Sequence, residues 1–134
     1  MKTHMQNQTF SLRSRMRSIG YAINGVGRFF REEPNAWLHL CATILVALAL
    51  VFLEFSTGQK LALIIVTGFV WVAEVFNTAV ERMMDFHAPG YDPAVGAIKD
   101  IAAGAVLLAS LTSVLVAAVI FIPKIKMLCS VYFS

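Results

Sequence analysis

The sequence predicts an all-α integral membrane protein, with an N-terminal amphipathic helix at the membrane interface followed by three transmembrane helices. Of its 134 residues, 58% are hydrophobic and only 14% are charged, and the mean hydropathy is +0.72. Soluble domains contain about 25% charged residues, so this composition indicates a lipid environment. Three apolar stretches are long enough to cross a bilayer, which requires about 17 to 25 residues each. We expect one membrane-embedded domain, residues 9–134, after a disordered leader, residues 1–8.

The first predicted element is a surface helix over residues 9–32, for which Thr9 or Ser11 is a suitable N-cap. Its apolar residues recur at alternating steps of four and three: Leu12, Met16, Ile19, Ile23, Val26 and Phe30. Four arginines flank this apolar stripe: Arg13, Arg17, Arg28 and Arg31. Such a pattern is typical of a helix that lies in the membrane interface. A simple anchor and a coiled-coil seam are the alternative interpretations.

The three predicted transmembrane segments are residues 36–53, 61–80 and 101–122. Pro34 separates the first segment from the surface helix. Asp92 followed by Pro93 predicts the start of the third helix, because aspartate is a favoured N-cap and proline suits the first helical position. Three helices leave little interior in which to bury Glu74 of the second segment, so we expect several copies of the chain to associate.

Basic residues predict the orientation in the membrane. Six of them precede the first segment: Lys2, Arg13, Arg15, Arg17, Arg28 and Arg31. Arg82 and Lys99 lie between the second and third segments, so the positive-inside rule places the N-terminus and this connection in the cytoplasm. The net charge of +3 favours anionic lipid headgroups over nucleic acid as a partner, since no groove-reading motif occurs.

One face of the second segment carries four polar side chains at the spacing of helical turns: Glu74, Asn77, Glu81 and Asp85. A carboxylate within a membrane costs about 2.5 kcal/mol or more, so acids in such positions usually have a function. Glu32, Glu33 and Asp100 add negative charge at the same membrane border. A divalent cation would relieve the repulsion, and Mg²⁺ prefers one or two carboxylates together with water and phosphate oxygens.

The spacing of these groups suggests separate roles. Glu74 and Glu81 are two helical turns apart, about 10 Å, so Glu33 is a more natural second metal ligand for Glu81. Glu74 lies deeper, where a desolvated carboxylate can accept the proton of a lipid hydroxyl. Lys99 would neutralise phosphate charge from the water side, and Asn77 could orient the base or a phosphate oxygen. The pattern suits phosphoryl transfer to a lipid, at a nucleotide site without a Walker A sequence or a protein-kinase glycine loop.

The segment Glu74-Val-Phe-Asn77-Thr-Ala-Val-Glu81, followed by Asp85 and by Lys99-Asp100-Ile-Ala-Ala-Gly-Ala-Val-Leu, resembles the prokaryotic diacylglycerol kinase family, which includes undecaprenol kinases. The likeness extends from about Gly20-Tyr21 to about Ser110. It implies a homotrimer of three-span subunits in the bacterial inner membrane, with active sites at subunit boundaries. It also implies the use of Mg-ATP to convert undecaprenol or diacylglycerol to undecaprenyl phosphate or phosphatidic acid.

The resemblance also implies residue roles. Glu74 corresponds to the family's proton acceptor, while Glu33 and Glu81 correspond to metal ligands that also contact the nucleotide. The other implied nucleotide contacts are Tyr21, Gly90, Tyr91, Asp92, Lys99 and Asp100. Asn77 and Asp85 are assigned supporting roles. The spacing of Asn35 and His39 is similar to that of the undecaprenol kinase branch, and we assign both to lipid binding.

The sequence departs from the family pattern at two positions. Ser14 stands where the family often has an arginine, which Arg13, Arg15 or Arg17 could replace. Asp92 stands where a histidine is frequent, which puts that nucleotide contact in question.

A small oligomeric transporter, in which Glu74 binds protons or cations, is the competing interpretation, and a noncatalytic assembly module is a third. Asp85 could also be a helix-end charge, and His39 a hydrogen-bonded residue between helices. A transporter does not require Glu33 and Lys99 at the cytoplasmic border, whereas a kinase does. This difference favours the kinase.

Overall fold

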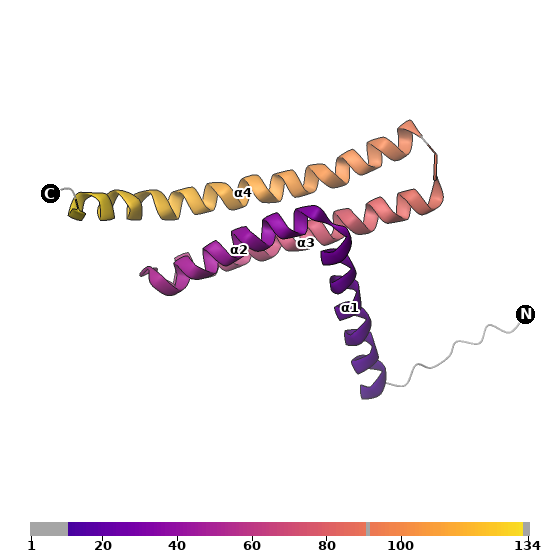
Figure 1. Ribbon diagram of the computed structural model, residues 1–134, viewed down its shortest axis with the longest axis horizontal. Coiled ribbons are helices and arrows are strands. Elements are labelled where there is room, and N and C mark those ends of the chain that lie inside the picture. Colours follow the sequence, from indigo (N-terminus) through magenta and orange to yellow (C-terminus); the bar gives the residue numbers. More distant parts are fainter. Residues whose placement is uncertain (1–10, 91, 133–134) are drawn as a thin grey trace, which may run out of the picture.

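The computed structural model describes residues 11–90 and 92–132, which form four helices and, within these ranges, no strand. The helices are α1 (Leu12–Glu32), α2 (Pro34–Phe52), α3 (Thr57–His87) and α4 (Pro93–Tyr132). Helices α2, α3 and α4 run lengthwise beside one another, whereas α1 projects away from this bundle at the start of α2, near the middle of α3 (Figure 1). The predicted all-α architecture is confirmed. Residues 1–8, expected to form a disordered leader, lie outside the described residues.

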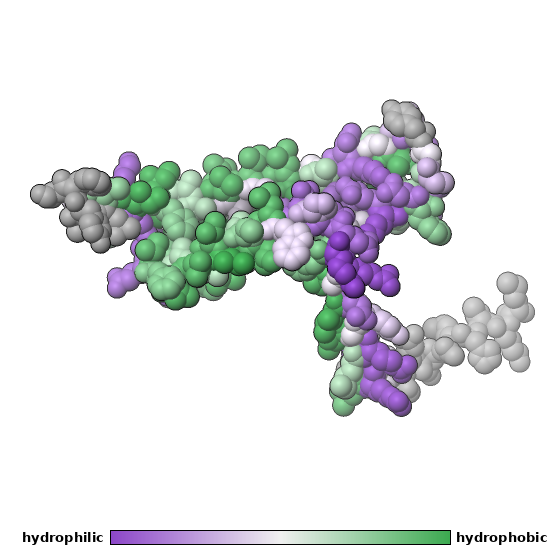
Figure 2. Space-filling view, viewed as in Figure 1, coloured by the Kyte–Doolittle hydropathy of each residue, from purple (hydrophilic) through white to green (hydrophobic). Residues whose placement is uncertain are grey.

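Helix α1 is amphipathic along its whole length. Apolar residues cover the side of α1 toward the apolar part of the bundle, and polar residues cover the opposite side (Figure 2). Leu12, Met16 and Ile19 are 77%, 73% and 60% exposed, so the first half of this apolar side packs against no other described helix. The helix begins at Leu12 rather than at residue 9, and Ser11 precedes it without a capping hydrogen bond from its side chain.

Aromatic packing holds the C-terminal end of α1 against the bundle. The rings of Phe29 and Phe30 lie 6.1 and 5.3 Å from the ring of Trp71 on α3. Glu33 is the single extended residue between α1 and α2, and its N–H group donates to the carbonyl oxygen of Phe29. Pro34 then starts α2, because proline needs no backbone hydrogen-bond partner in the first turn. The chain therefore turns sharply at Glu33.

Helices α2, α3 and α4 are each long and apolar enough to cross a membrane. The predicted span 36–53 matches α2 within two residues at its start, whereas α3 and α4 extend beyond the predicted spans at both ends. A capping box between Ser56 and Gln59 starts α3 at Thr57. Asp92 Oδ1 accepts from the N–H group of Ala94 at 2.8 Å, which confirms the predicted cap before Pro93. The predicted second and third spans therefore cover only the apolar parts of the longer helices α3 and α4.

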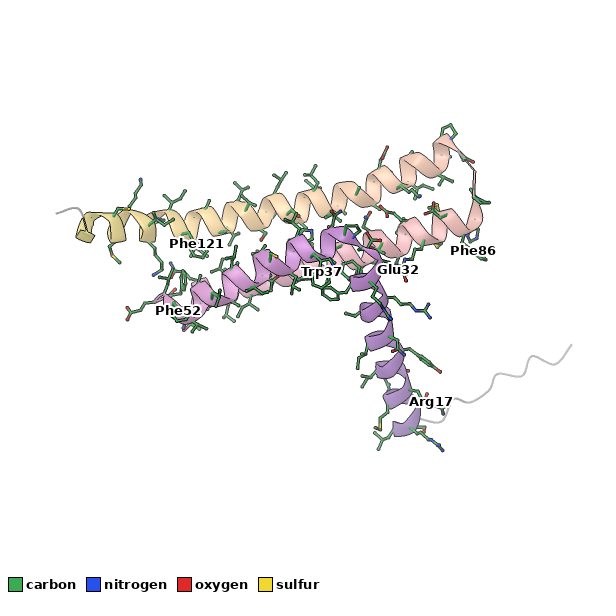
Figure 3. The ribbon with its side chains drawn as sticks, viewed as in Figure 1. Arg17, Glu32, Trp37, Phe52, Phe86 and Phe121 are labelled. Carbon is green, nitrogen blue, oxygen red and sulfur yellow. The ribbon has the colours of Figure 1, made fainter. Side chains whose placement is uncertain are left out.

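Helix α4 packs most extensively against α3. Phe55, Leu63 and Ile120 form a buried apolar cluster at the end of the bundle where Phe52 and Phe121 lie in Figure 3. Lys124 secures this end, since its ammonium group donates to the carbonyl oxygen of Glu54 and lies 4.6 Å from the centre of the Phe55 ring. Most other large apolar side chains are exposed, as expected for helices that face lipid.

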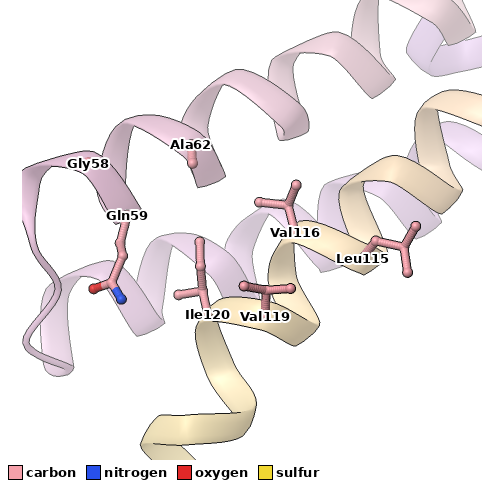
Figure 4. A pocket seen from close by; sticks show the side chains of 7 residues that line it. All are labelled: Gly58, Gln59, Ala62, Leu115, Val116, Val119 and Ile120. Carbon is pink, nitrogen blue, oxygen red and sulfur yellow. The ribbon is translucent and has the colours of Figure 1, made fainter.

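A shallow apolar cleft of about 400 Å³ lies between the start of α3 and the second half of α4 (Figure 4). Its lining residues are Gly58, Gln59, Ala62, Leu115, Val116, Val119 and Ile120. Gln59 is the one polar side chain of this lining, and it already belongs to the capping box of α3. This cleft lies at the end of the bundle where α3 begins, so it is separate from the acidic residues described next.

Candidate active site

Polar residues gather around the junction of α1 with the bundle and from there toward the connection between α3 and α4 (Figure 2). Figure 3 places Glu32 at the junction of α1 with the bundle, with Trp37 close by at the start of α2. Glu33 follows directly at the break between the two helices. The C-terminal half of α3 carries Glu74 and Glu81 along this end of the bundle.

Glu74 is buried, with only 5% of its surface exposed. Its Oε1 atom lies 2.7 Å from Nε2 of His39 on α2, which is hydrogen-bond distance for a carboxylate and an imidazole. We assign the imidazole nitrogen as the donor, since an ionised carboxylate only accepts. The structure therefore pairs the deepest acid with the one histidine of the first membrane span.

A second pair of hydrogen bonds positions the backbone and ring around His39. The hydroxyl group of Thr43 donates to the carbonyl oxygen of His39 at 2.7 Å, and Trp71 Nε1 donates to the Thr43 hydroxyl oxygen at 2.9 Å. The rings of Trp71 and His39 meet edge to face, 6.1 Å between centroids. These contacts tie α2 to α3 one turn from Glu74, so the carboxylate has a defined partner.

The expectation that burial of Glu74 requires several copies of the chain is wrong. Glu74 is buried within a single chain, because α2 crosses α3 at the position that brings His39 onto the carboxylate. Counting the predicted spans does not reveal this contact, because it depends on how α2 packs against α3. The burial of Glu74 is therefore no evidence for an oligomer.

Asn77 and Glu81 form the next layer of the stripe on α3. Asn77 Nδ2 donates to Glu81 Oε1 at 3.0 Å, which orients the Glu81 carboxylate. The other atom of this amide, Asn77 Oδ1, is buried and accepts no hydrogen bond within the described part of the chain. The hydroxyl oxygen of Thr78 is likewise buried without a hydrogen-bond partner among the described residues. A buried acceptor without a donor is costly, so Asn77 Oδ1 suits a cation or a donor from a ligand.

Glu33 lies close enough to these acids to sense their charge. Burial raises the pKa of Glu33 above its ordinary value of 4.5, and the charge of Glu81 raises it further. Arg82 opposes this rise in the pKa, while Glu74 and Glu32 add to it. The acids of α1, α2 and α3 therefore form one electrostatic cluster in which like charges repel.

Within the described residues, no three acid, histidine or cysteine side chains are close enough to hold a metal ion by themselves. A magnesium site at this position would need ligands from a substrate or water, because Mg²⁺ in phosphate sites takes few protein ligands and keeps water and phosphate oxygens. The predicted ligands Glu33 and Glu81 lie within electrostatic reach of each other, and Asn77, whose amide oxygen has no hydrogen-bond donor among the described residues, is bonded to Glu81.

Two ion pairs surround the acidic cluster. Lys99 of α4 pairs with Asp85 of α3, which fixes the predicted Lys99 and Asp85 side chains against each other. Arg82 Nη2 of α3 lies 2.6 Å from Glu32 Oε2 of α1. Both ion pairs therefore join two helices.

The remaining predicted nucleotide contacts are more dispersed. Tyr21 is 72% exposed on α1 and is twelve residues before Glu33, about 18 Å along a helix. Gly90 and Asp92 are exposed in the connection between α3 and α4, and Asp92 serves as the cap of α4. Asp100 and the predicted lipid contact Asn35 are also exposed. Tyr91 lies outside the described residues.

Sequence reasoning missed two partners in this cluster. His39 was assigned to lipid binding, with a hydrogen bond between helices as the alternative; the structure shows this hydrogen bond, to Glu74, a partner that was not named. Arg82 was used only to orient the chain in the membrane. A signal existed for His39, since a polar residue inside a membrane span requires a partner and Glu74 is the main acid of the next span. No spacing rule could have paired Arg82 with Glu32, because the contact depends on how α1 crosses the bundle.

The fold and the site define a helical membrane protein with a buried carboxylate beside a cluster of acids. Residues 20–121 match the family model of the prokaryotic diacylglycerol kinases. The chain belongs to this family, and it is a membrane lipid kinase, a phosphotransferase of the multi-pass inner-membrane class. As a kinase of this family it uses ATP and a lipid as its substrates.

Two characterised relatives are similar over 109 residues, which is 81% of this chain. The undecaprenol kinase of Bacillus subtilis is 29% identical, and the match covers 89% of that protein. The diacylglycerol kinase of Synechocystis is 30% identical, but the match covers only 62% of its length.

Proposed function

We propose that this protein phosphorylates the hydroxyl group of undecaprenol or diacylglycerol with Mg-ATP, and that Glu74 is the general base. The observation that carries the proposal is the buried Glu74 carboxylate, held by His39 directly below a cluster of acids. A base must lie within hydrogen-bond reach of the proton that it accepts. Glu74 is the acid of this cluster that an alcohol arriving from the membrane meets first.

The acceptor lipid would approach through a membrane-facing cleft of about 220 Å³ between α2, α3 and α4. His39 and Trp71 line this cleft on the side of Glu74, and Leu38, Val46 and Val114 are among its apolar residues. An apolar cleft with a few polar groups at one end suits a hydrocarbon chain that ends in a hydroxyl group. Asn35 lies one turn before His39, toward the headgroup level.

Glu33 and Glu81 would hold Mg²⁺ from the water side, with Asn77 orienting Glu81. When bound, the metal ion supplies positive charge to the transferring phosphoryl group. Lys99 would neutralise phosphate oxygens, and Asp85 sets its position. Other nucleotide contacts on this side of the membrane would come from Tyr21, Asp100 and the connection formed by Gly90, Tyr91 and Asp92.

These roles fit one orientation in the membrane. We place the N-terminus and the connection between α3 and α4 in the cytoplasm, where ATP is available, and α1 in the membrane interface. The apolar side of α1 is the side toward the apolar part of the bundle, which supports an interfacial position (Figure 2). We further propose a homotrimer, because α2 exposes Ile44, Leu45 and Leu48 that other copies could cover.

Reconstitution in lipid vesicles tests the function. The purified chain is incubated with Mg²⁺, ATP labelled on its terminal phosphate, and undecaprenol or diacylglycerol. We expect label in one or both lipids. Undecaprenol is the first candidate, since the spacing of Asn35 and His39 resembles that branch of the family. Label in neither lipid would contradict the proposal and favour the transporter.

The role of Glu74 is tested by Glu74→Gln, which keeps the shape and removes the base. We expect turnover to be abolished while ATP binding is retained. Glu54→Gln is the matched control, because Glu54 is an exposed acid at the opposite end of the bundle. Phosphorylation by Glu74→Gln at the parental rate would show that another group accepts the proton.

A further inference from the structure

Arg82 is a cation at the mouth of the site to which the sequence analysis assigned no chemical role. It directly follows the predicted metal ligand Glu81 on α3, and its guanidinium lies 2.6 Å from Glu32 of α1. The side chains of Arg82 and Glu32 are 42% and 54% exposed, so both are open to water. Arg82 also lies within electrostatic reach of Glu33, whose pKa it lowers against the effect of the acids.

The negative charge of the site favours a further cationic side chain, besides Lys99, as a contact for a bound nucleotide. Four acids, Glu33, Glu74, Glu81 and Asp85, occupy this end of α3 and its junction with α1. Lys99 is paired with Asp85. A triphosphate brings several further negative charges, and one metal ion and one lysine leave part of this charge unbalanced.

An ion pair as exposed as that of Arg82 with Glu32 contributes little to stability, typically less than about 1 kcal/mol. A planar guanidinium binds phosphate through two parallel hydrogen bonds, and such charge-assisted pairs are the stronger ones. A phosphate group can therefore replace Glu32 on Arg82 at small cost. Glu32 itself is no part of the proposed base or metal ligands.

We propose that Arg82 is a phosphate-binding residue, held near the site by Glu32 in the free enzyme and transferred to the ATP phosphates when the nucleotide binds. This inference rests on the proposed function, because it takes ATP at the cluster of Glu33 and Glu81 as given. It adds a nucleotide contact from α3 to those predicted from the sequence.

The alternative is that the pair only fastens α1 to α3. The two explanations differ in what happens when each partner is removed. A structural fastening is lost equally in Arg82→Gln and Glu32→Gln, so both variants would have the same defect. A phosphate contact is lost only in Arg82→Gln, whereas Glu32→Gln frees the guanidinium and removes one negative charge from the site.

The test compares these two variants and Arg82→Lys with the parent chain in vesicles. ATP binding is measured by displacement of a fluorescent ATP analogue, and KM for ATP is measured at saturating lipid. We expect Arg82→Gln to weaken ATP binding about tenfold, which corresponds to about 1.4 kcal/mol, with KM for the lipid within about twofold of the parent. Arg82→Lys should be intermediate, and Glu32→Gln should bind ATP at least as tightly as the parent.

Lys60→Gln is the control for a lost positive charge, since Lys60 is exposed at the start of α3, far from the acids. Equal weakening of ATP binding in Arg82→Gln and Glu32→Gln would overturn the inference. It would show that the ion pair only holds α1 against α3. Unchanged ATP binding in Arg82→Gln would overturn it as well. A parent chain that binds ATP but labels no lipid would instead contradict the proposed function, and the binding comparison would still decide the role of Arg82.

Discussion

Replacing His39 by alanine is the sharpest test of how the site works. In the parent chain the imidazole occupies one oxygen of a carboxylate that is only 5% exposed. Alanine would leave Glu74 buried without this partner and free to change its rotamer. A hydrogen bond to a charged group contributes about 1.5–3 kcal/mol, and each 1.36 kcal/mol of a barrier is a factor of ten in rate. If the bond is needed in the transition state, kcat falls about tenfold to 150-fold.

The assay separates this positioning role from direct contact with the lipid. Initial rates are measured in vesicles while ATP and the lipid acceptor are varied in turn. We expect His39→Ala to lower kcat with little change in KM for ATP. His39→Gln, whose amide can still donate to Glu74, should recover part of the rate. His87→Ala is the control, because His87 is an exposed histidine at the end of α3 that makes no contact with Glu74 among the described hydrogen bonds.

Two results would refute this reasoning. A kcat of His39→Ala within about twofold of the parent would show that the bond to Glu74 has no part in turnover. A raised KM for the lipid with an unchanged kcat would return His39 to the role predicted from the sequence, contact with the acceptor. Thermal unfolding in detergent checks that the variant remains folded.

Two further predictions concern the proposed metal ligands. Glu81→Gln should raise the Mg²⁺ concentration needed for half-maximal rate by about tenfold or more, because a direct ligand is lost; an unchanged titration would remove Glu81 from the ligands. The raised pKa of Glu33 means that its charge opposes folding: its contribution is most favourable below the ordinary value of 4.5 and is lost as the pH rises through the raised value. Glu33→Gln should therefore increase the melting temperature of the metal-free protein at neutral pH, with the gain shrinking toward pH 4.5, while it lowers activity. Melting curves across pH would contradict this if the gain grew in acid.

The membrane spans and the acidic stripe could be read from the sequence because both are local properties. The apolar stretches and the repeat of Leu12, Met16 and Ile19 depend only on neighbours in the chain, and the helices follow them closely. The helix ends were less accurate, since capping groups such as Ser56 and Asp92 extend α3 and α4 beyond their apolar parts. The family likeness likewise depended on short spacings within α3 and at the start of α4.

Contacts between helices were decided by the tertiary structure. His39 and Glu74 are 35 residues apart, and their bond depends on the depth at which α2 lies along α3. The pair of Arg82 and Glu32 depends on the turn at Glu33 and on the aromatic packing of α1 against Trp71. Periodicity tells which side chains share a face of one helix, but it contains no information on the rotation and offset of the neighbouring helix. In this protein the sequence by itself determined which acids line up, and only the packing of the helices decided which partner each of them has.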